Sequence, residues 1–207
     1  MENTTPTWLE LARELFSISQ SGLTYCKNEY DLERYRRLGE ISAEMIAIQS
    51  GVAKDRVMQE FSIQSGYATP KIDVRGAVFR DGKLLLVQER ADNNWAMPGG
   101  WADLGDLPSA MVEREVLEES GLTVRAVKVV AVYDANRIEP MEFFHAYKLV
   151  FLCEILGGEL RTSYETLDVK FFDLAHLPPL SASRTNQVMI DEALAHQQDS
   201  NRRTHFD

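Results

Sequence analysis

The chain has 207 residues, of which 44% are hydrophobic and 26% are charged, a composition typical of a folded protein of one or two domains. Its formal net charge of −10 argues against binding to nucleic acid or to an anionic membrane, because both need a basic surface. No stretch has the pattern of a signal peptide or of a membrane span, and Cys26 and Cys153 have no partner at the spacing of a disulfide or metal site. We therefore expect a reduced, cytoplasmic protein that does not bind membranes.

Residues 1–66 are predicted to form a small all-helical domain. Apolar residues recur at helical spacing between Trp8 and Ile18, and Thr5 or Thr7 is the candidate N-cap of this first helix. So small an amphipathic unit cannot bury its own apolar stripe, so we expect it to pack against the second domain or against another subunit. A homodimer is the expected assembly.

A second helix is predicted over residues 28–49, and Gly51 is expected to end it. A third, shorter helix is predicted over residues 52–61. The second helix is expected to turn five side chains inward: Tyr35, Leu38, Ile41, Met45 and Ile48. Two helices joined by a turn also occur in DNA-binding proteins, but the acidic residues of the second helix outnumber its arginines. Such a helix would meet phosphates with net negative charge, which disfavours DNA binding.

From residue 67 the hydrophobic period changes from helices to strands, so residues 67–207 are predicted to form a second domain. Strands are expected over residues 72–79 and 84–89, joined by a tight turn at Asp81-Gly82, because glycine tolerates a positive φ. Further expected elements are strands over 124–134, 143–156 and 168–174, a loop at 136–140, a turn at Gly157-Gly158, a helix over 184–196 and a frayed tail over 197–207.

A helix is predicted after Pro108 and is expected to end at Gly121, since proline near a helix start and glycine just past its end are the usual arrangement. Glu115, Glu118 and Glu119 are three and four residues apart, which places them on one face of this helix. Like charges this close cost stability unless a divalent cation binds among them, and Mg²⁺ and Mn²⁺ prefer oxygen ligands. The alternative is an ordinary solvated acidic face.

The same residues resemble the Nudix box, whose pattern is G-x5-E-x7-R-E-U-x-E-E-x-G-U with U an aliphatic residue. The matching positions are Gly100, Arg114, Glu115, Val116, Glu118, Glu119, Gly121 and Leu122. Asp106 stands where the family has its first glutamate. Residues 67–75 and 95–103, together with Leu180-Ser181 and Arg184, resemble a Nudix subfamily that carries an N-terminal helical domain.

This resemblance implies an α/β fold, an α/β/α sandwich with a mixed sheet, preceded by the helical domain. It also implies an enzyme that hydrolyses, with a divalent metal, the pyrophosphate bond of a nucleoside diphosphate linked to another group. ADP-ribose is the first substrate expected and CDP-choline the second. Two alternatives stay open: a Nudix-like sensor that binds a nucleotide without cutting it, and an RNA 5′-end pyrophosphohydrolase.

The metal ligands that the resemblance implies are Glu115, Glu118, Glu119 and the carbonyl of Gly99 or Gly100, with Mg²⁺ as cofactor and Mn²⁺ as a substitute. Arg114, one helical turn before Glu118, is expected to pair with it and orient it. Glu165 lies on a segment that resembles the loop carrying the general base in related pyrophosphatases, and Glu118 is the alternative base. Candidate substrate contacts are Arg75, Arg90, Arg137 and Trp95, although each arginine could be an ordinary surface charge and Trp95 a core residue.

Overall fold

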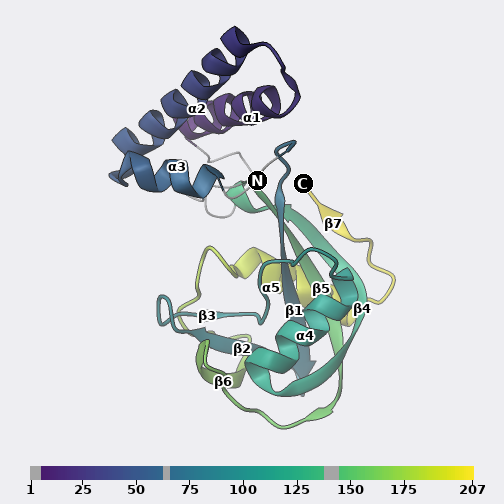
Figure 1. Ribbon diagram of the computed structural model, residues 1–207. Helices are drawn as coiled ribbons and strands as arrows, with labels where there is room; N and C mark the ends of the chain where they lie inside the picture. Colours follow the sequence, from purple (N-terminus) through teal and green to yellow (C-terminus); the bar gives the residue numbers. More distant parts are fainter. Residues whose placement is uncertain (1–5, 63–65, 138–144) are drawn as a thin grey trace. The chain divides into compact units, whose positions relative to one another are not determined.

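The computed structural model describes residues 6–62, 66–137 and 145–207 and divides into two compact units (Figure 1). The helical unit extends to Pro70, and the sheet unit begins at Lys71. Across the described ranges, no helix is long and apolar enough to cross a membrane. The predicted fold class, a mixed sheet with helices that follows an N-terminal helical segment, is confirmed.

The helical unit contains three helices: α1 (Thr7–Tyr25), α2 (Glu29–Ser50) and α3 (Lys54–Ser62). The N-cap of α1 is Pro6, without a side-chain cap, so the predicted capping by Thr7 is wrong, and Thr5 lies outside the described residues. Asn28 caps α2, because its side chain accepts hydrogen bonds from two backbone N–H groups of the first turn. Gly51 ends α2 with a φ of 72°, as predicted.

The face of α2 that is buried differs from the predicted one. Its buried residues are Gly39, Ser42, Ala43 and Ile46. Of the five side chains predicted to point inward, four are only partly buried and Ile48 is 77% exposed. Small residues occupy the contact because α1 and α2 approach closely, and Ser42 Oγ donates to the carbonyl of Ala12 on α1 at 2.6 Å. The stacked rings of Phe16 and Phe61, with centroids 3.7 Å apart, add a contact between α1 and α3.

The sheet unit is built on a seven-stranded mixed sheet (Figure 1). Its strands, in spatial order, are β3 (Trp95–Ala96), β2 (Lys83–Glu89), β1 (Lys71–Arg80), β5 (Ala146–Gly158), β4 (Leu122–Asp134) and β7 (His205–Phe206), while β6 (Thr166–Asp173) also pairs with β2. The central pair, β1 and β5, is parallel, with Val74 opposite Leu149. The predicted tight turn between β1 and β2 is confirmed, because Asp81 and Gly82 have φ angles of 51° and 74°.

Two hydrophobic clusters involve alternating residues of the sheet and two helices, α4 (Pro108–Ser120) and α5 (Gln187–Gln198). Val74 and Val78 of β1 belong to the same cluster as Met111, Val112 and Val116 of α4. Ala77 belongs instead to the cluster that contains Met189, Ile190 and Ala193 of α5. Because successive side chains of a strand point to opposite faces, the two helices cover opposite faces of the sheet. This is the predicted α/β/α arrangement.

Three predicted details of the sheet unit are wrong. Gly157-Gly158 ends β5 and makes no turn of its own, and α5 begins at Gln187, after an N-cap at Asn186, later than predicted. The tail is not frayed: β7 pairs in parallel with β4, and the guanidinium of Arg202 donates twice to Glu192 at 2.8 Å. The polar composition of residues 197–207 suggested fraying. The tail is ordered by partners on β4 and α5, which local composition does not reveal. Part of the predicted loop at 136–140 and the start of the strand predicted at 143 lie outside the described residues.

Candidate active site

The segment 97–102, which precedes α4, runs antiparallel to β1. Three backbone hydrogen bonds of 2.8–2.9 Å join the two, and in one of them the carbonyl of Gly100 accepts from the N–H of Val74. Gly99 has a φ of 148°, and a Cβ at this position would lie 1.9 Å from the carbonyl oxygen of Val74. Only glycine permits this approach. One lone pair of the Gly100 carbonyl is therefore used by β1, and the other remains for a metal.

The three glutamates of α4 differ in burial. Glu119 is 5% exposed, and its Oε2 accepts a hydrogen bond from the backbone N–H of Gly99 at 2.9 Å. Burial raises the pKa of Glu119 to about 8, and the nearby Arg75 guanidinium and the Gly99 N–H act in the opposite direction. Burial also raises the pKa of Glu115, whereas the side chain of Glu118 is 58% exposed. Two of the three acids therefore lie where an isolated negative charge is unfavourable.

Arg114 connects three carboxylates around the start of this face. Its guanidinium lies 3.0 Å from Glu115, 3.4 Å from Glu118 and 3.1 Å from Asp106. Asp106 also accepts from the N–H of Asp103 at 3.2 Å. The shorter aspartate, at the position where the Nudix pattern has glutamate, thus still reaches Arg114. The contact between Arg114 and Glu118 is the one that the sequence suggested.

The donor set suits a hard divalent cation by its chemistry. Glu115, Glu118 and Glu119 supply carboxylate oxygens from one helix, and Oε2 of Glu115 lies 3.1 Å from the place that a Cβ of Gly100 would take. Oxygen ligands are what Mg²⁺ and Mn²⁺ prefer. Burial disfavours negative charge on two of them, and a cation would offset that cost. Among the described residues, no three acidic, histidine or cysteine side chains converge on one point. Binding a cation would therefore replace some of the present contacts to Arg114 and Gly99.

Arg75 is a buried residue of β1, although the sequence suggested either a substrate contact or a surface charge. It is 4% exposed, and its guanidinium donates to both carboxylate oxygens of Asp73 at 2.9 and 3.2 Å. A third hydrogen bond, of 3.2 Å, goes to the carbonyl of Met97, and Lys148 also binds Asp73. This network ties β1 and β5 to the segment that carries Gly99.

Trp95 lies in the same cluster as α5 and is 8% exposed, which favours the alternative that it is a core residue. Its ring meets that of Phe172 edge to face, with centroids 4.6 Å apart. Arg137 ends the short 3₁₀ helix η1 (Ala135–Arg137), and its side chain is partly buried. The contacts of Trp95 given above thus place it in the core.

Glu165 lies on the loop 161–165, which shares a pocket of about 450 Å³ with Glu118 and Glu119. Several hydrogen bonds hold this loop in place. Arg90 donates through Nε to the carbonyl of Tyr164 at 2.9 Å and through its backbone N–H to the carbonyl of Glu165 at 3.3 Å. Further hydrogen bonds within residues 163–166 and one of 3.3 Å to the carbonyl of Glu119 complete the attachment. Arg90 therefore holds this loop in place.

Glu89 was missed by the sequence reasoning. It ends β2, with Nη1 of Arg75 3.9 Å and Nε of Arg184 3.4 Å from its carboxylate. Burial raises the pKa of Glu89, and the charges of Arg184 and Arg75 lower it. Arg184 also donates to Ser181 Oγ at 3.0 Å, and that hydroxyl donates to Asp92 at 2.7 Å. In the sequence, this cluster was indicated only through Ser181 and Arg184, which belong to the resemblance to the Nudix subfamily.

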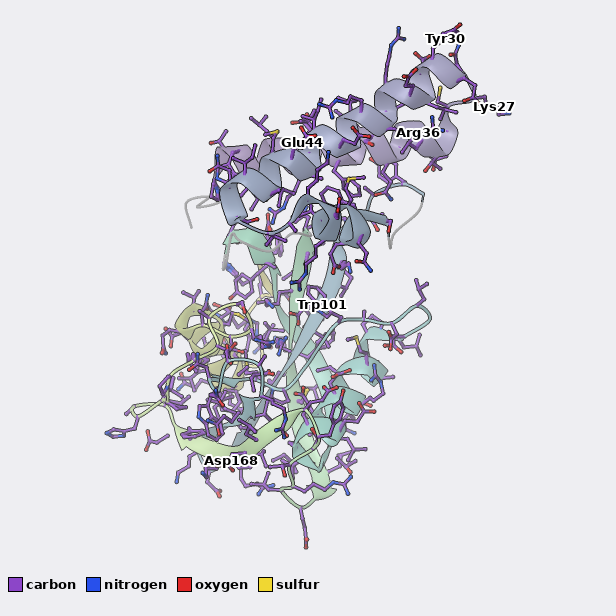
Figure 2. The ribbon with its side chains drawn as sticks, turned by 60° about the vertical axis from the view of Figure 1, so that its left-hand side comes forward. Lys27, Tyr30, Arg36, Glu44, Trp101 and Asp168 are labelled. Atoms are coloured by element: carbon purple, nitrogen blue, oxygen red, sulfur yellow. The ribbon has the colours of Figure 1, made fainter. Side chains whose placement is uncertain are left out.

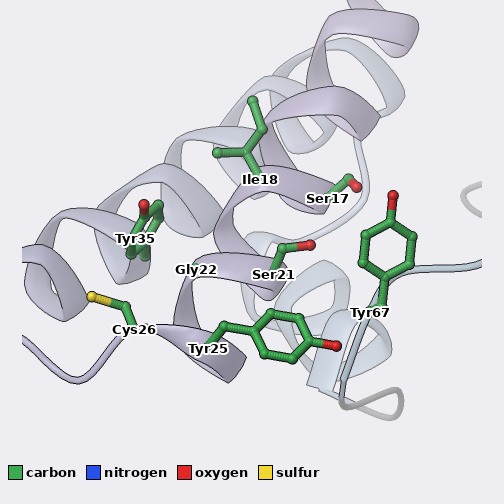
Figure 3. Close-up of a pocket in the computed structure, with 8 residues that line it drawn as sticks. All are labelled: Ser17, Ile18, Ser21, Gly22, Tyr25, Cys26, Tyr35 and Tyr67. Carbon is green, nitrogen blue, oxygen red and sulfur yellow. The ribbon is translucent and has the colours of Figure 1, made fainter.

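The helical unit has a hollow of its own, of about 580 Å³ (Figure 3). Its eight lining residues include three tyrosines and two serines but no acid and no arginine. Figure 3 shows the rings of Tyr25 and Tyr67 and the hydroxyl groups of Ser17 and Ser21 around this space. The hollow therefore lacks the charges that would hold a metal or a diphosphate.

Helix α2 carries charged side chains of both signs, among them Arg36 and Glu44, which Figure 2 labels on this helix. Several are paired: Arg34 with Asp31 at 2.7 Å, Arg37 with Glu40 at 2.9 Å, and Lys54 of α3 with Glu44 at 2.6 Å. Cations already neutralised by carboxylates do not form a basic stripe for phosphates. These paired cations of α2 and α3 therefore offer little free positive charge to a phosphate backbone.

Comparison with known proteins covers both units. Residues 70–192 match the family described as NUDIX domain, and residues 6–61 match the family described as UDP-X-like, N-terminal oligomerisation domain. The Bacillus subtilis protein YjhB, provisionally named an ADP-ribose pyrophosphatase, is 37% identical over 97% of both chains. A solved UDP-X diphosphatase is 30% identical, covers 97% of this chain and 98% of its own, and has a TM-score of 0.64. An ADP-ribose pyrophosphatase from Streptococcus suis is 39% identical over 67% of this chain and 100% of its own, with a TM-score of 0.62.

Proposed function

Because the chain belongs to the Nudix hydrolase family, we propose that it hydrolyses the pyrophosphate bond of a nucleoside diphosphate linked to another group. ADP-ribose is the first candidate substrate and CDP-choline the second. The observation that carries the proposal is the arrangement of the α4 glutamates beside Gly99-Gly100, with Glu119 hydrogen-bonded to the Gly99 N–H at 2.9 Å. The names of the relatives from Bacillus subtilis and Streptococcus suis support ADP-ribose as the first substrate to test.

We further propose that Glu115, Glu118, Glu119 and the Gly100 carbonyl hold Mg²⁺, with Mn²⁺ as a substitute. A bound divalent cation supplies positive charge at the phosphoryl oxygens and makes water more acidic. The protein's own residues prepare this place. Arg114 orients Glu115 and Glu118 through contacts of 3.0 and 3.4 Å, and the buried network of Arg75 supports the backbone that carries Gly99.

In the proposed reaction, a water oxygen bonds to one phosphorus of the diphosphate while the bridging P–O bond on its far side breaks. The products are a nucleoside monophosphate and the phosphorylated second group. Glu165 takes the proton of the water, and its position in one pocket with Glu118 and Glu119 supports this role. Glu118 is the alternative base. Arg90 acts as a positioning residue, since its two hydrogen bonds to residues 164 and 165 hold the loop that carries Glu165.

A panel of linked nucleotides, incubated with Mg²⁺ or Mn²⁺ and resolved by phosphorus NMR, tests the proposal. Two phosphomonoester signals from ADP-ribose or CDP-choline are expected, and none in the absence of a divalent cation. If a nucleoside triphosphate is cleaved but neither linked diphosphate is, the proposed substrate class is wrong. Binding without cleavage would support the sensor alternative, and release of pyrophosphate from a triphosphorylated RNA would support the RNA alternative.

We propose that the chain forms a homodimer through its helical unit. The description of the family that residues 6–61 match, an oligomerisation domain, supports self-association. The unit also leaves Leu11 and Ile18 exposed on α1 and has an open hollow of about 820 Å³ with Phe16 and Phe61 in its wall. Apolar surface of this kind is stabilised by burial against a second copy. A monomeric mass in light scattering at micromolar concentration would contradict the dimer.

A further inference from the structure

A diphosphate bound beside α4 needs cationic donors, because the pocket there is lined by glutamates. Two of the arginines first considered for this role are bound elsewhere. Arg75 is buried against Asp73, and Arg90 holds the carbonyl of Tyr164. A suitable donor would lie in the same pocket as the glutamates and have its guanidinium free.

Arg161 lies at the C-terminal end of α4, where its backbone N–H donates to the carbonyl of Ser120 at 2.9 Å. Its side chain passes over Gly121, the residue that ends the helix. A Cβ on Gly121 would lie 2.5 Å from Cγ and 3.2 Å from Cδ of Arg161. The missing side chain at Gly121 therefore makes room for Arg161, and packing against the helix end sets the course of its aliphatic stem.

Arg161 lines the pocket of about 450 Å³ together with Glu118, Glu119 and Glu165. Glu118 is paired with Arg114, and Glu119 accepts from the Gly99 N–H. Among the residues that the structure describes, no hydrogen bond or ion pair engages the guanidinium of Arg161. Its five N–H donors are thus free for an anion, in a place where the neighbouring carboxylates would otherwise repel one.

We propose that Arg161 is a substrate-binding residue whose guanidinium donates to phosphoryl oxygens of the diphosphate. The inference rests on the proposed function, because it assigns a ligand to the pocket of that same site. A planar guanidinium can bind two oxygens at once, whereas an ammonium group binds as a point charge. Lysine at this position is therefore expected to restore only part of the binding.

The first test compares Arg161→Gln and Arg161→Lys with the wild-type protein in steady-state hydrolysis. Arg161→Gln should raise KM about 10- to 100-fold, the range expected for a charged hydrogen bond, with a much smaller change in kcat. Arg161→Lys should lie between Gln and wild type, and the melting temperature of both variants should stay close to that of the wild type. The matched control is Arg125→Gln on β4, because Arg125 is exposed and paired with Glu154 at 2.6 Å, outside the pocket. A fall in kcat without a rise in KM would overturn the proposal.

The second test measures binding of inorganic pyrophosphate with Mg²⁺ by calorimetry and needs no turnover. Arg161→Gln should weaken this binding about 10- to 100-fold, while Arg125→Gln should not. If the wild type cleaves none of the linked nucleotides but Arg161→Gln still weakens pyrophosphate binding, the proposed function fails and Arg161 remains an anion-binding residue. Equal binding by wild type and Arg161→Gln, or no binding by the wild type, would overturn the inference about Arg161.

Discussion

Open hollows occur in both units of this chain, and one of the two in the helical unit is close in size to the one beside α4, but the walls of these two differ in chemistry. The hollow of the helical unit, about 580 Å³, is lined by tyrosines, serines and aliphatic groups. That of the sheet unit, about 450 Å³, brings Glu118, Glu119 and Glu165 together with Arg161. The volume of a hollow therefore does not show which of the two is the candidate active site. The charges do, because metal binding and phosphoryl transfer need carboxylates and cations at one place.

The largest effect is expected from the carboxylates of the sheet unit. Glu119→Gln should lower kcat by about a thousandfold or more, because it removes a proposed ligand of the metal that would stabilise the charge on the phosphoryl oxygens. Tyr25→Phe in the helical hollow should change kcat little, and Glu154→Gln controls for loss of an exposed carboxylate on β5. Steady-state rates with saturating Mg²⁺ measure all three. Near wild-type turnover in both Glu119→Gln and Glu118→Gln would remove α4 from the mechanism.

A smaller loss of kcat is expected from a substitution in the loop 161–165. Glu165→Gln should reduce kcat about a hundredfold with unchanged metal affinity, since positioned general bases contribute about that much. The assay is a pH–rate profile at saturating metal, with metal affinity measured separately by calorimetry. Asp168→Asn, on β6 and paired with Lys170, is a nearby control. A change of only a few fold in Glu165→Gln would return the role of base to Glu118.

The close approach of Gly99 to β1 predicts that a side chain at this position destabilises the folded protein. Gly99→Ala is expected to lower the free energy of unfolding by at least about 2 kcal/mol, because its Cβ would lie 1.9 Å from the carbonyl oxygen of Val74 and its φ of 148° disfavours a side chain. Urea denaturation measures the change. Gly157→Ala is the control, since a Cβ there meets nothing within 4 Å. Equal stability of the two variants would show that the loop relaxes freely.

The smallest effects concern the pH dependence of stability. In the sheet unit the expected contribution to the free energy of unfolding falls as the pH rises, and in the helical unit it falls as the pH is lowered. The pKa of Glu119 in the folded protein, about 8, lies above its ordinary value of 4.5 because of burial. The folded state then binds this proton more tightly, so the free energy of unfolding falls as the pH rises from 4.5 to about 8. The pKa of Glu44 in the helical unit is lowered by Lys54 and Arg37, so its contribution to stability is lost as the pH falls below 4.5.

Urea denaturation of the wild type and of Glu119→Gln between pH 5 and pH 8, with EDTA present, measures the first effect. Glu119→Gln should become the more stable of the two as the pH rises, by about 1 kcal/mol or more at pH 8. Adding Mg²⁺ should stabilise the wild type and narrow the difference. A pH-independent difference between the two proteins would show that Glu119 titrates normally in the folded state.

The sequence by itself determined the features that depend on near neighbours along the chain. The helix α4, with Pro108 at its start and Gly121 at its end, and the face that Glu115, Glu118 and Glu119 share follow from helical spacing. The hairpin between β1 and β2 follows from the conformational freedom of one Asp-Gly pair. These predictions held because the interactions that decide them span only a few residues.

The tertiary structure alone decided which charged residues surround the site. Arg75 is buried because Asp73 and Met97 meet it, and Lys148, 75 residues further along the chain from Asp73, completes that network. Arg161 shares a pocket with the glutamates, and the connection from β5 to β6 that carries it passes the end of α4 at Gly121. A charged side chain looks the same in a sequence whether it faces water, a buried partner or a substrate. The difference lies in contacts between residues far apart in the chain, and those contacts exist only after the sheet has formed.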